Sequence, residues 1–269
     1  MADETVVRSG GVDLTRPSAA RVYDYYLGGA HNFAVDREMA ERAMGLWPDL
    51  PLIMQANRAF LRRAVRFCVE AGIRQFLDLG SGIPTVGNVH EVAQDAAPDA
   101  RVAYVDNDPI ATAYSENILR GNRQTAVVQA DLRKPEEVLD NPEVRSLLNF
   151  DEPIAVMMVA VLHFVPDSDD PAAIIARYRE VMAPGSFLTV SHASQDGQPG
   201  QADSHQDLYN RTATPMSMRS NSQVAALLTG FELVEPGVVF LPQWRPVSPE
   251  DVDEHPERFS GLAVVGRKI

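Results

Sequence analysis

An aspartate and two glycines at the end of an apolar run are the residues of this sequence best suited to hold a ligand. The run Phe76–Leu79 contains Asp78 and is followed by Gly80, Ser81 and Gly82. Glycines allow the backbone to approach a ligand closely, and a helix that opens after such a turn presents free N–H groups. We therefore expect the turn from Asp78 to Gly82 to line a binding site.

A glycine turn of this kind also occurs in dinucleotide-binding proteins, but the rest of the fingerprint is missing here. The third small residue of a G-x-G-x-x-G pattern would stand where the sequence has Thr85, preceded by Pro84. In addition, the acid Asp78 lies inside the apolar run rather than after it. A nicotinamide-dependent oxidoreductase is therefore the weaker alternative.

The turn resembles the first motif of the class I S-adenosylmethionine-dependent methyltransferases, which has an acid, one apolar residue and then Gly-x-Gly. In that family the second strand ends with an acid that binds both ribose hydroxyls, and Asp106 matches it after Val102–Val105. A carboxylate can accept both bonds from a vicinal diol, each worth about 1.5–3 kcal/mol. The resemblance also implies that Asn107 borders the adenine, whereas Asp108 before Pro109 fits a helix N-cap.

Two further runs match the same family at the ends of later strands. Asp131 and Leu132 follow the run Thr125–Gln129, where the family places an acid against the adenine amino group. The run Met158–Val165 contains Ala160 and His163 and is similar to the fourth-strand motif, whose Leu-His pair faces the methyl donor. His163 is a candidate catalytic base, and a structural histidine beneath the cofactor is the alternative.

The N-terminal residues carry a more specific resemblance. Residues 17–33, Asp36-Arg37 and residues 55–61 are similar to an actinobacterial methyltransferase family of undefined substrate, once catalogued as a domain of unknown function. The likeness covers nearly the whole chain. It implies S-adenosylmethionine as cofactor and leaves the methyl acceptor open.

The charges of the donor's methionine end indicate which N-terminal side chains would complete the site. Asp78 suits the ammonium, and Arg58, beside Asn57, suits the carboxylate. Aromatic faces favour a cation, so we expect an N-terminal cluster to close over the sulfonium. Its members are Tyr23, Tyr26, His31 and Asn32, of which Tyr23 is also a candidate catalytic residue, and helix packing is the alternative for both tyrosines.

The elements that must position these residues alternate along the chain. Apolar periodicity predicts helices near residues 86–96, 110–119, 135–148 and 172–182, and strands at 75–79, 101–105, 125–129, 154–161 and 187–191. Such alternation is typical of a parallel, doubly wound sheet. We expect an α/β, Rossmann-like, mostly parallel sheet of seven strands.

The segments before and after this alternating pattern do not continue it. Residues 1–15 are expected to be a flexible tail and 16–72 a helical appendage over the cofactor site, with helices near 17–27, 35–44 and 53–71, while 73–269 form the Rossmann-like domain. Residues 192–217 are polar without an apolar period, which predicts a long connection. A short helix near 221–228 and the runs 231–234, 238–241 and 262–265 would complete the fold, with 242–258 as a surface loop.

Composition narrows the class of protein. The 269 residues are 45% hydrophobic and 23% charged, which is typical of a globular protein. Lys and Arg number 24 against 37 Asp and Glu, so the net charge of −13 disfavours nucleic acid as a partner. The arginines at 58, 62, 63 and 66 have the spacing of a solvated helix face. The single cysteine, Cys68, and the lack of a long apolar run predict a cytoplasmic protein with no membrane partner.

The predicted function is methyl transfer to a small-molecule acceptor by in-line displacement at the sulfonium methyl. No Asn-Pro-Pro-Tyr-type sequence follows the fourth strand, which argues against exocyclic amines of DNA bases. A non-catalytic S-adenosylmethionine-binding regulator would keep the same motifs and remains an alternative. A metal site at His192 and His205 matches no common ligand spacing, and Ser81 lacks the Gly-x-Ser-x-Gly context of a serine hydrolase.

Overall fold

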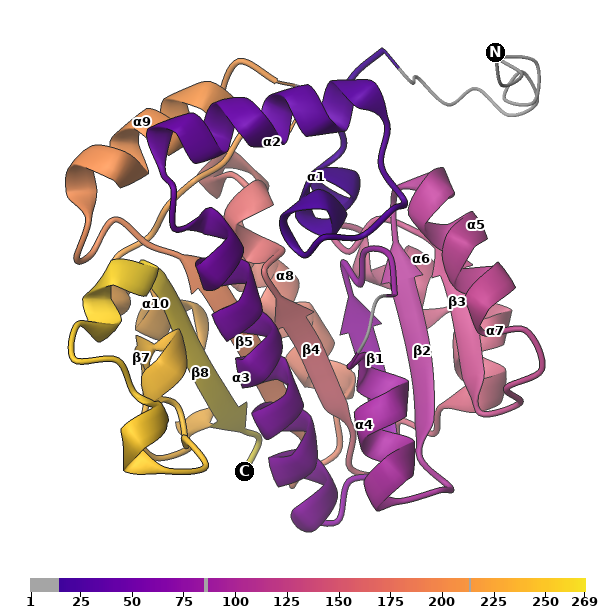
Figure 1. Ribbon diagram of the computed structural model, residues 1–269. Coiled ribbons are helices and arrows are strands. Elements are labelled where there is room, and N and C mark those ends of the chain that lie inside the picture. Colours follow the sequence, from indigo (N-terminus) through magenta and orange to yellow (C-terminus); the bar gives the residue numbers. More distant parts are fainter. Residues whose placement is uncertain (1–14, 85–86, 213) are drawn as a thin grey trace.

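The computed structural model describes residues 15–84, 87–212 and 214–269, and its centre is one twisted sheet (Figure 1). The sheet order is β3-β2-β1-β4-β5-β8-β6, and β7 also pairs with β8. The first five strands are parallel, and β8 runs antiparallel to β5. The strands are β1 (Gln75–Leu79), β2 (Arg101–Asp106), β3 (Thr125–Gln129), β4 (Ala155–Val159), β5 (Phe187–Ala193), β6 (Glu232–Leu233), β7 (Val239–Phe240) and β8 (Gly261–Arg267).

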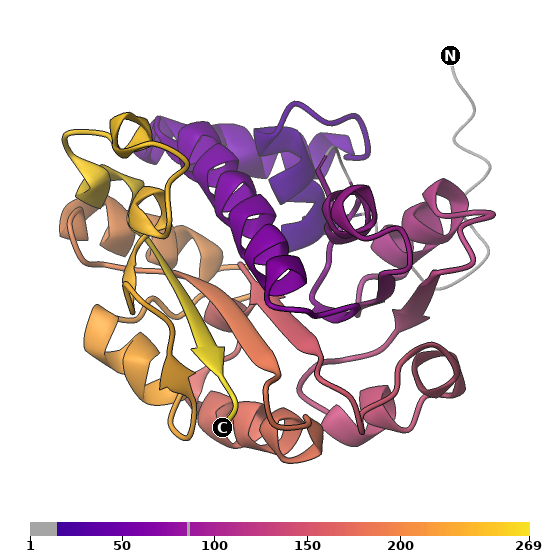
Figure 2. The same ribbon diagram turned by 90° about the horizontal axis from the view of Figure 1, so that it is seen from below.

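Helices cover both faces of this sheet, as the view from below shows (Figure 2). The long helix α3 (Leu50–Glu70) and α4 (Val89–Ala96) lie on one face. The other face carries α6 (Pro135–Leu139), α7 (Pro142–Leu147), α8 (Pro171–Val181) and α10 (Asn221–Leu227), and α5 (Pro109–Ile118) follows β2. Strands β1, β2, β4 and β5 are almost completely buried because both of their faces pack against apolar side chains. The mostly parallel, Rossmann-like α/β fold expected from the sequence is therefore confirmed.

The expected number of strands is wrong, because the sheet has eight strands rather than seven. The additional pairing comes from β6 and β7, each two residues long, which share β8 as their partner. The expected helix over residues 135–148 is two helices. The first ends at Leu139 with Asp140 as its C-cap, and Asn141 caps the second by accepting a hydrogen bond from the N–H of Glu143, while Pro142 opens the second helix.

The expected long connection over residues 192–217 is also wrong in part, since it contains the helix α9 (Pro199–Tyr209). Its buried residues are Ala202, His205 and Tyr209, which follow a helical spacing, while most of its other side chains are exposed. This helix lies beside α2 (Ala34–Leu46) above the sheet (Figure 1). Tertiary contact with α2, rather than apolar periodicity, holds it in place.

The N-terminal helices lie over the sheet edge at which the parallel strands end. Helices α1 (Ala19–Tyr26) and α2 contact each other above the sheet (Figure 1). Their buried apolar residues, with those of α3, belong to the same core cluster as Val102 of β2 and Val265 of β8. Residues 1–14 of the expected tail, together with Thr85 and Val86, lie outside the described residues. No helix among the described residues is long and apolar enough to cross a membrane.

Candidate functional site

A cavity of about 550 Å³ lies where the N-terminal helices meet the carboxyl ends of the parallel strands. This is the place at which open α/β sheets bind their ligands, and the volume is ordinary for a small-molecule site. Most of the residues expected to bind a cofactor line this cavity: Tyr23, Tyr26, Arg58, Asp78, Gly80, Ser81, Gly82, Asp106, Asn107, Asp131, Leu132, Ala160 and His163.

The glycine turn is held against the end of β2 by its own backbone. The N–H groups of Gly80 and Ser81 both donate to the carbonyl of Val105, at 2.8 and 3.1 Å. Gly80 has φ +71°, and a Cβ added there would overlap the side chain of Val161; Gly82 has φ +65°. Both conformations favour glycine, so no side chain projects from the turn at these two positions. Leu79 belongs instead to the core beneath the sheet and does not line the cavity.

Asp106 is fixed in position at the end of β2 by two backbone donors. Its Oδ2 accepts from the N–H of Gly82 at 2.7 Å, and its Oδ1 accepts from the N–H of Asp108 at 2.8 Å. Burial raises the pKa of Asp106 to about 6, despite these hydrogen bonds to the ionised form. Each carboxylate oxygen retains a lone pair, so the two hydroxyls of a ribose can donate hydrogen bonds to Asp106 without displacing the backbone N–H groups.

Asp78 is buried at the cavity wall, and no hydrogen bond to its carboxylate is found among the described residues. Burial raises its pKa to about 7, and Asp106 adds to this rise, whereas the charge of Arg58 opposes it. Arg58 also lines the cavity, with its guanidinium carbon 5.7 Å from the centre of the Tyr23 ring. A buried carboxylate beside a guanidinium presents two opposite charges to whatever enters the cavity.

Asp131 at the end of β3 is paired with a neighbour of its own loop. Arg133 donates to both of its carboxylate oxygens, at distances of 2.6–3.0 Å. Partial burial acts to raise the pKa of Asp131, but the hydrogen bonds and charge of Arg133 outweigh burial and lower it. Arg133 also pairs with Asp169 and lines the cavity, so this pair closes the β3 side of the site.

A directional chain of hydrogen bonds connects α1 with the end of β4. The backbone N–H of Ala160 donates to Ser191 Oγ at 2.9 Å, Ser191 Oγ donates to Asn57 Oδ1, and Asn57 Nδ2 donates to the Tyr23 hydroxyl at 2.8 Å. The Tyr23 hydroxyl then donates to the carbonyl of Met54 at 3.4 Å. Ala160 has φ +57°, and this chain helps to hold that unusual conformation beside the cavity.

His163 and His192 lie on the β4 and β5 side of the cavity, and their ring centres are 5.6 Å apart. His163 Nδ1 accepts from the N–H of Ala193 at 3.3 Å. His192 Nε2 accepts from Arg219 at 2.9 Å, and its Nδ1 donates to the carbonyl of Ala193 at 2.7 Å. Because both of its ring nitrogens are engaged in this way, His192 is a structural histidine and not a metal ligand.

His31 and Asn32 do not line the cavity, unlike the two tyrosines with which they were grouped. The backbone N–H of His31 and the side-chain amide of Asn32 both donate to Asp24 Oδ2, at 2.8 and 2.9 Å. The His31 ring packs against Tyr114 of α5, with ring centres 4.6 Å apart. Asp24 is almost fully buried, so these two residues shape the loop between α1 and α2 around it.

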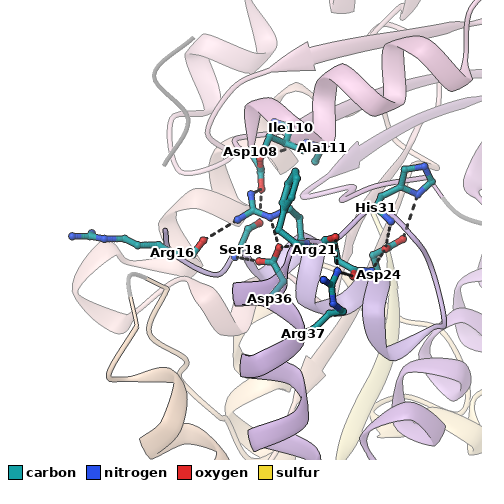
Figure 3. Close-up of polar contacts among 12 residues, drawn as sticks. Arg16, Ser18, Arg21, Asp24, His31, Asp36, Arg37, Asp108, Ile110 and Ala111 are labelled. Atoms are coloured by element: carbon teal, nitrogen blue, oxygen red, sulfur yellow. Dashed lines mark hydrogen bonds and ion pairs between the residues drawn. The ribbon is translucent and has the colours of Figure 1, made fainter. Parts of the chain in front are cut away.

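A charged cluster that was not predicted attaches these two helices to the sheet (Figure 3). Buried Arg21 donates through Nε to Asp36 at 2.8 Å and through Nη1 to Asp108 at 3.3 Å. The Ser18 hydroxyl also donates to Asp108, whose other oxygen caps α5 through the N–H of Ile110, as predicted. Only the motif of the N-terminal resemblance, which includes Arg21 and Asp36, signalled that these residues matter.

The environment of one arginine of α3 differs from the solvated face expected for it. Arg63 does not belong to a solvated face, because it is half-buried and donates to the backbone carbonyls of Leu241 and Trp244, at 2.7 and 2.8 Å. It therefore ties α3 to the C-terminal segment. Cys68, by contrast, is buried in the core as its position on the apolar stripe predicted.

Comparison with known proteins shows the family to which the chain belongs. The sequence model of the S-adenosyl methyltransferase family matches residues 6–269. A solved protein of Thermobifida fusca is 41% identical, with 98% of this chain and 99% of that chain covered and a TM-score of 0.91. A DUF574 family protein of Streptomyces avermitilis is 39% identical, with 96% and 99% covered and a TM-score of 0.91.

More distant structures share the fold. Human N-acetylserotonin methyltransferase, solved in complex with S-adenosylmethionine, is 15% identical, with 94% of this chain and 63% of that chain covered and a TM-score of 0.50. No match was found among curated proteins. The family model and the two similar structures cover nearly the whole chain, N-terminal helices included. The chain belongs to the S-adenosyl methyltransferase family.

Proposed function

We propose that this protein binds S-adenosylmethionine in the cavity at the ends of β1 and β2 and transfers its methyl group to a small molecule. The observation that carries the proposal is Asp78, a buried carboxylate that lines the cavity and to which no hydrogen bond is found among the described residues. Such a group is costly unless a ligand supplies a partner. The ammonium of the donor's methionine end is a partner of the right charge.

The other lining residues fit the remaining parts of the same ligand. Arg58 would pair with the methionine carboxylate, and Asp106 would accept the ribose hydroxyls. Gly80 and Gly82 would leave room for the part of the ligand between its methionine carboxylate and its ribose. Asn107, Asp131 and Leu132 would border the base. When bound, S-adenosylmethionine supplies a methyl group on a cationic sulfur, already activated for in-line displacement.

The protein's own contribution to the reaction is alignment and exclusion of water. Helix α1 covers the cavity and is tied to it through Tyr23 and Asn57. Tyr23 would therefore act by position, because its hydroxyl already accepts one hydrogen bond and donates another, and burial raises its pKa. Tyr26 would add an aromatic face for the cation. Holding both reactants in line removes much of the entropic barrier.

Calorimetric titration with S-adenosylhomocysteine, the demethylated product, tests the binding site. Asp106→Ala should weaken binding by at least about 1.5–3 kcal/mol, the value of one charge-assisted hydrogen bond, since two such bonds are lost. Glu116→Ala, an exposed acid on α5, is the matched control and should bind as the unchanged protein does. Lack of binding by the unchanged protein would refute the proposal.

Catalysis needs a separate experiment, because a regulatory protein could bind the donor without turnover. The protein is incubated with donor labelled in the methyl group and with metabolite extracts of actinobacteria. We expect label to appear in a small molecule, and Asp106→Ala to reduce its rate of appearance. Binding without any label transfer across broad extracts would instead favour the regulator.

A further inference from the structure

The lining of the cavity changes character from one side of the sheet to the other. All six charged residues of the lining lie on α3 or at the ends of β1, β2 and β3: Arg58, Asp78, Asp106, Asp108, Asp131 and Arg133. Toward β4, β5, β8 and α9, the described lining contains no Asp, Glu, Lys or Arg. We call this part the uncharged end; it is lined by Tyr26, Trp47, Met54, His163, Phe164, His192, His205, Tyr209, Met216, Met218 and Leu241.

Rings form a continuous wall in this uncharged end. Successive ring centres along it lie 4.4–5.9 Å apart, in edge or tilted arrangements. The order along the wall is Trp47, His205, Tyr209, Phe164, His163 and His192. Flat ligands pack well against such walls because aromatic edges and faces attract each other. Met216 and Met218 adapt their shape to what they contact.

The imidazoles of this wall do not supply a positive charge. Burial lowers the pKa of His192 and of His205 to about 4, and it holds the pKa of His163 well below its usual range. All three rings are therefore neutral near pH 7. A carboxylate or phosphate on the ligand would lose its water here without gaining a counter-ion. The uncharged end thus selects against ligands that carry a carboxylate or a phosphate.

Hydrogen bonding fixes which ring nitrogen of His163 carries the proton. Its Nδ1 accepts from the backbone N–H of Ala193, so the proton of the neutral ring must be on Nε2. His192 faces the opposite requirement, because Arg219 is always a donor and forces its Nε2 to accept. His163 can therefore donate a hydrogen bond from Nε2, but it has no lone pair left with which to take a proton.

His205 in the same wall is a second polar residue that indicates a ligand, independently of His163. Both ring nitrogens of His205 are buried, and neither has a hydrogen-bond partner among the described residues. This histidine is on α9, the helix that covers the uncharged end beside α2. A neutral imidazole offers one donor and one acceptor, which a hydroxyl or carbonyl on the ligand can satisfy.

We infer that the uncharged end is the acceptor subsite and takes a flat, uncharged phenol whose oxygen accepts a hydrogen bond from His163 Nε2–H. This rests on the proposed function, and it replaces the base role expected for His163 with that of a donor. The phenol ionises by releasing its proton to water. In the transfer, its oxygen forms a bond to the methyl carbon while the sulfur–carbon bond breaks and sulfur keeps the electron pair. His163 stabilises the phenolate oxygen before that step.

Paired probes test the chemistry of the subsite in protein saturated with S-adenosylhomocysteine. Phenol, 1-naphthol and 4-nitrophenol are titrated by calorimetry beside benzoate, 1-naphthoate and 4-nitrobenzoate. At least one phenol should bind tenfold more tightly than its carboxylate partner. Met218→Glu should remove that binding, whereas Asp207→Ala on the exposed face of α9 should not change it. Equal or tighter binding of the carboxylates, or no binding of any phenol, would overturn the inference.

The role of His163 is read from the colour of bound 4-nitrophenol, whose anion absorbs in the visible. In S-adenosylhomocysteine-saturated protein, a donor at position 163 favours the bound anion. The ionisation constant of the bound probe should therefore fall at least threefold in His163→Ala and recover in His163→Gln, whose amide also donates. Equal constants in all three proteins, or a His163→Gln constant as low as that of His163→Ala, would contradict the assignment.

The proposed function and the acceptor subsite are tested by separate outcomes. Calorimetry with S-adenosylhomocysteine alone is repeated for each variant, so a folded, donor-competent protein is verified first. Loss of that binding in the unchanged protein would overturn the proposed function. Normal binding of S-adenosylhomocysteine with the wrong preference among the probes would overturn only the acceptor subsite.

Discussion

At the scale of single residues, the unusual electrostatics of Asp78 give the site a pH dependence. Burial raises its pKa to about 7 in the folded protein, whereas an exposed aspartate titrates near 3.9. Between these values the folded state holds a proton that the unfolded state has lost. This group therefore lowers the stability of the ligand-free protein progressively as the pH rises from about 4 to about 7.

Asp78→Asn should remove that penalty. We expect its free energy of unfolding to exceed that of the unchanged protein above pH 7, by an upper limit of about 4 kcal/mol, and the gain to vanish near pH 4. Denaturant titrations at several pH values measure it. Asp151→Asn, at an exposed acid, is the control and should show no such trend. A gain that is the same at pH 4 and pH 8 would contradict the assignment.

The same carboxylate should couple ligand binding to proton release. An ammonium placed beside Asp78 favours the ionised form, so binding of S-adenosylhomocysteine near pH 6.5 should release up to about one proton. Calorimetry in buffers of different ionisation enthalpy counts these protons. The release should be largely lost in Asp78→Asn and small at pH 8.5, where the group is already ionised. Equal release by both proteins would assign it to another group.

Residue spacing shows which parts of the site were open to prediction. Asp78 is the last residue but one of β1 and Asp106 is the last of β2, and neighbouring parallel strands bring their carboxyl ends together, so their shared place in the cavity followed from the sequence. His31 and Asn32 did not follow this rule. Their direction depends on buried Asp24, whose contacts arise only after α1 and α2 have packed.

At the scale of elements, the attachment of the N-terminal helices depends on Arg21. This side chain bridges Asp36 at the start of α2 and Asp108 at the start of α5, and all three are largely buried (Figure 3). Removing one partner of such a pair leaves an uncompensated buried charge, which typically costs about 3–5 kcal/mol. Arg21→Ala should therefore destabilise the protein by about this amount.

The same change should also weaken the binding of S-adenosylhomocysteine, because Ser18 and Asp108 border the cavity. Arg37→Ala is the matched control: Arg37 lies nearby but is exposed, and within the described part of the chain its side chain hydrogen-bonds only to Asn32, so its loss should cost less than about 1 kcal/mol. Thermal unfolding and calorimetry compare the two. Equal effects of both changes would show that Arg21 is no more than a surface contact.

Helices and strands also differed in how well their bounds could be predicted from the local sequence. Strands β1 and β3 were predicted with their observed bounds because short apolar runs leave a strong pattern, although β1 is buried throughout and β3 only in part. Helix α9 was not, since its inner face consists of Ala202, His205 and Tyr209, which carry little apolar signal. Its stability comes from contact with α2, more than 150 residues away in the chain, and local sequence cannot show such a contact.

At the scale of the whole molecule, the N-terminal helices and the sheet share one core. Apolar residues of α1, α2 and α3 belong to the same buried cluster as those of β2, β5 and β8. The sequence predicts a helical appendage over residues 16–72 and a Rossmann-like domain over residues 73–269. The shared core predicts that both parts unfold in one cooperative step.

The two tryptophans can test this, because one lies on each side of the suggested boundary. Trp47 packs against His205 below α2, and Trp244 packs against Phe60 and Phe67 near the C-terminal strands; both are buried. Single-tryptophan proteins made by Trp47→Phe and Trp244→Phe report the two regions separately. In each protein, the denaturant midpoint from fluorescence should equal that from far-ultraviolet circular dichroism. An earlier fluorescence transition in the protein that retains only Trp47 would show that the N-terminal helices unfold on their own, and then binding of S-adenosylhomocysteine should raise that earlier midpoint selectively.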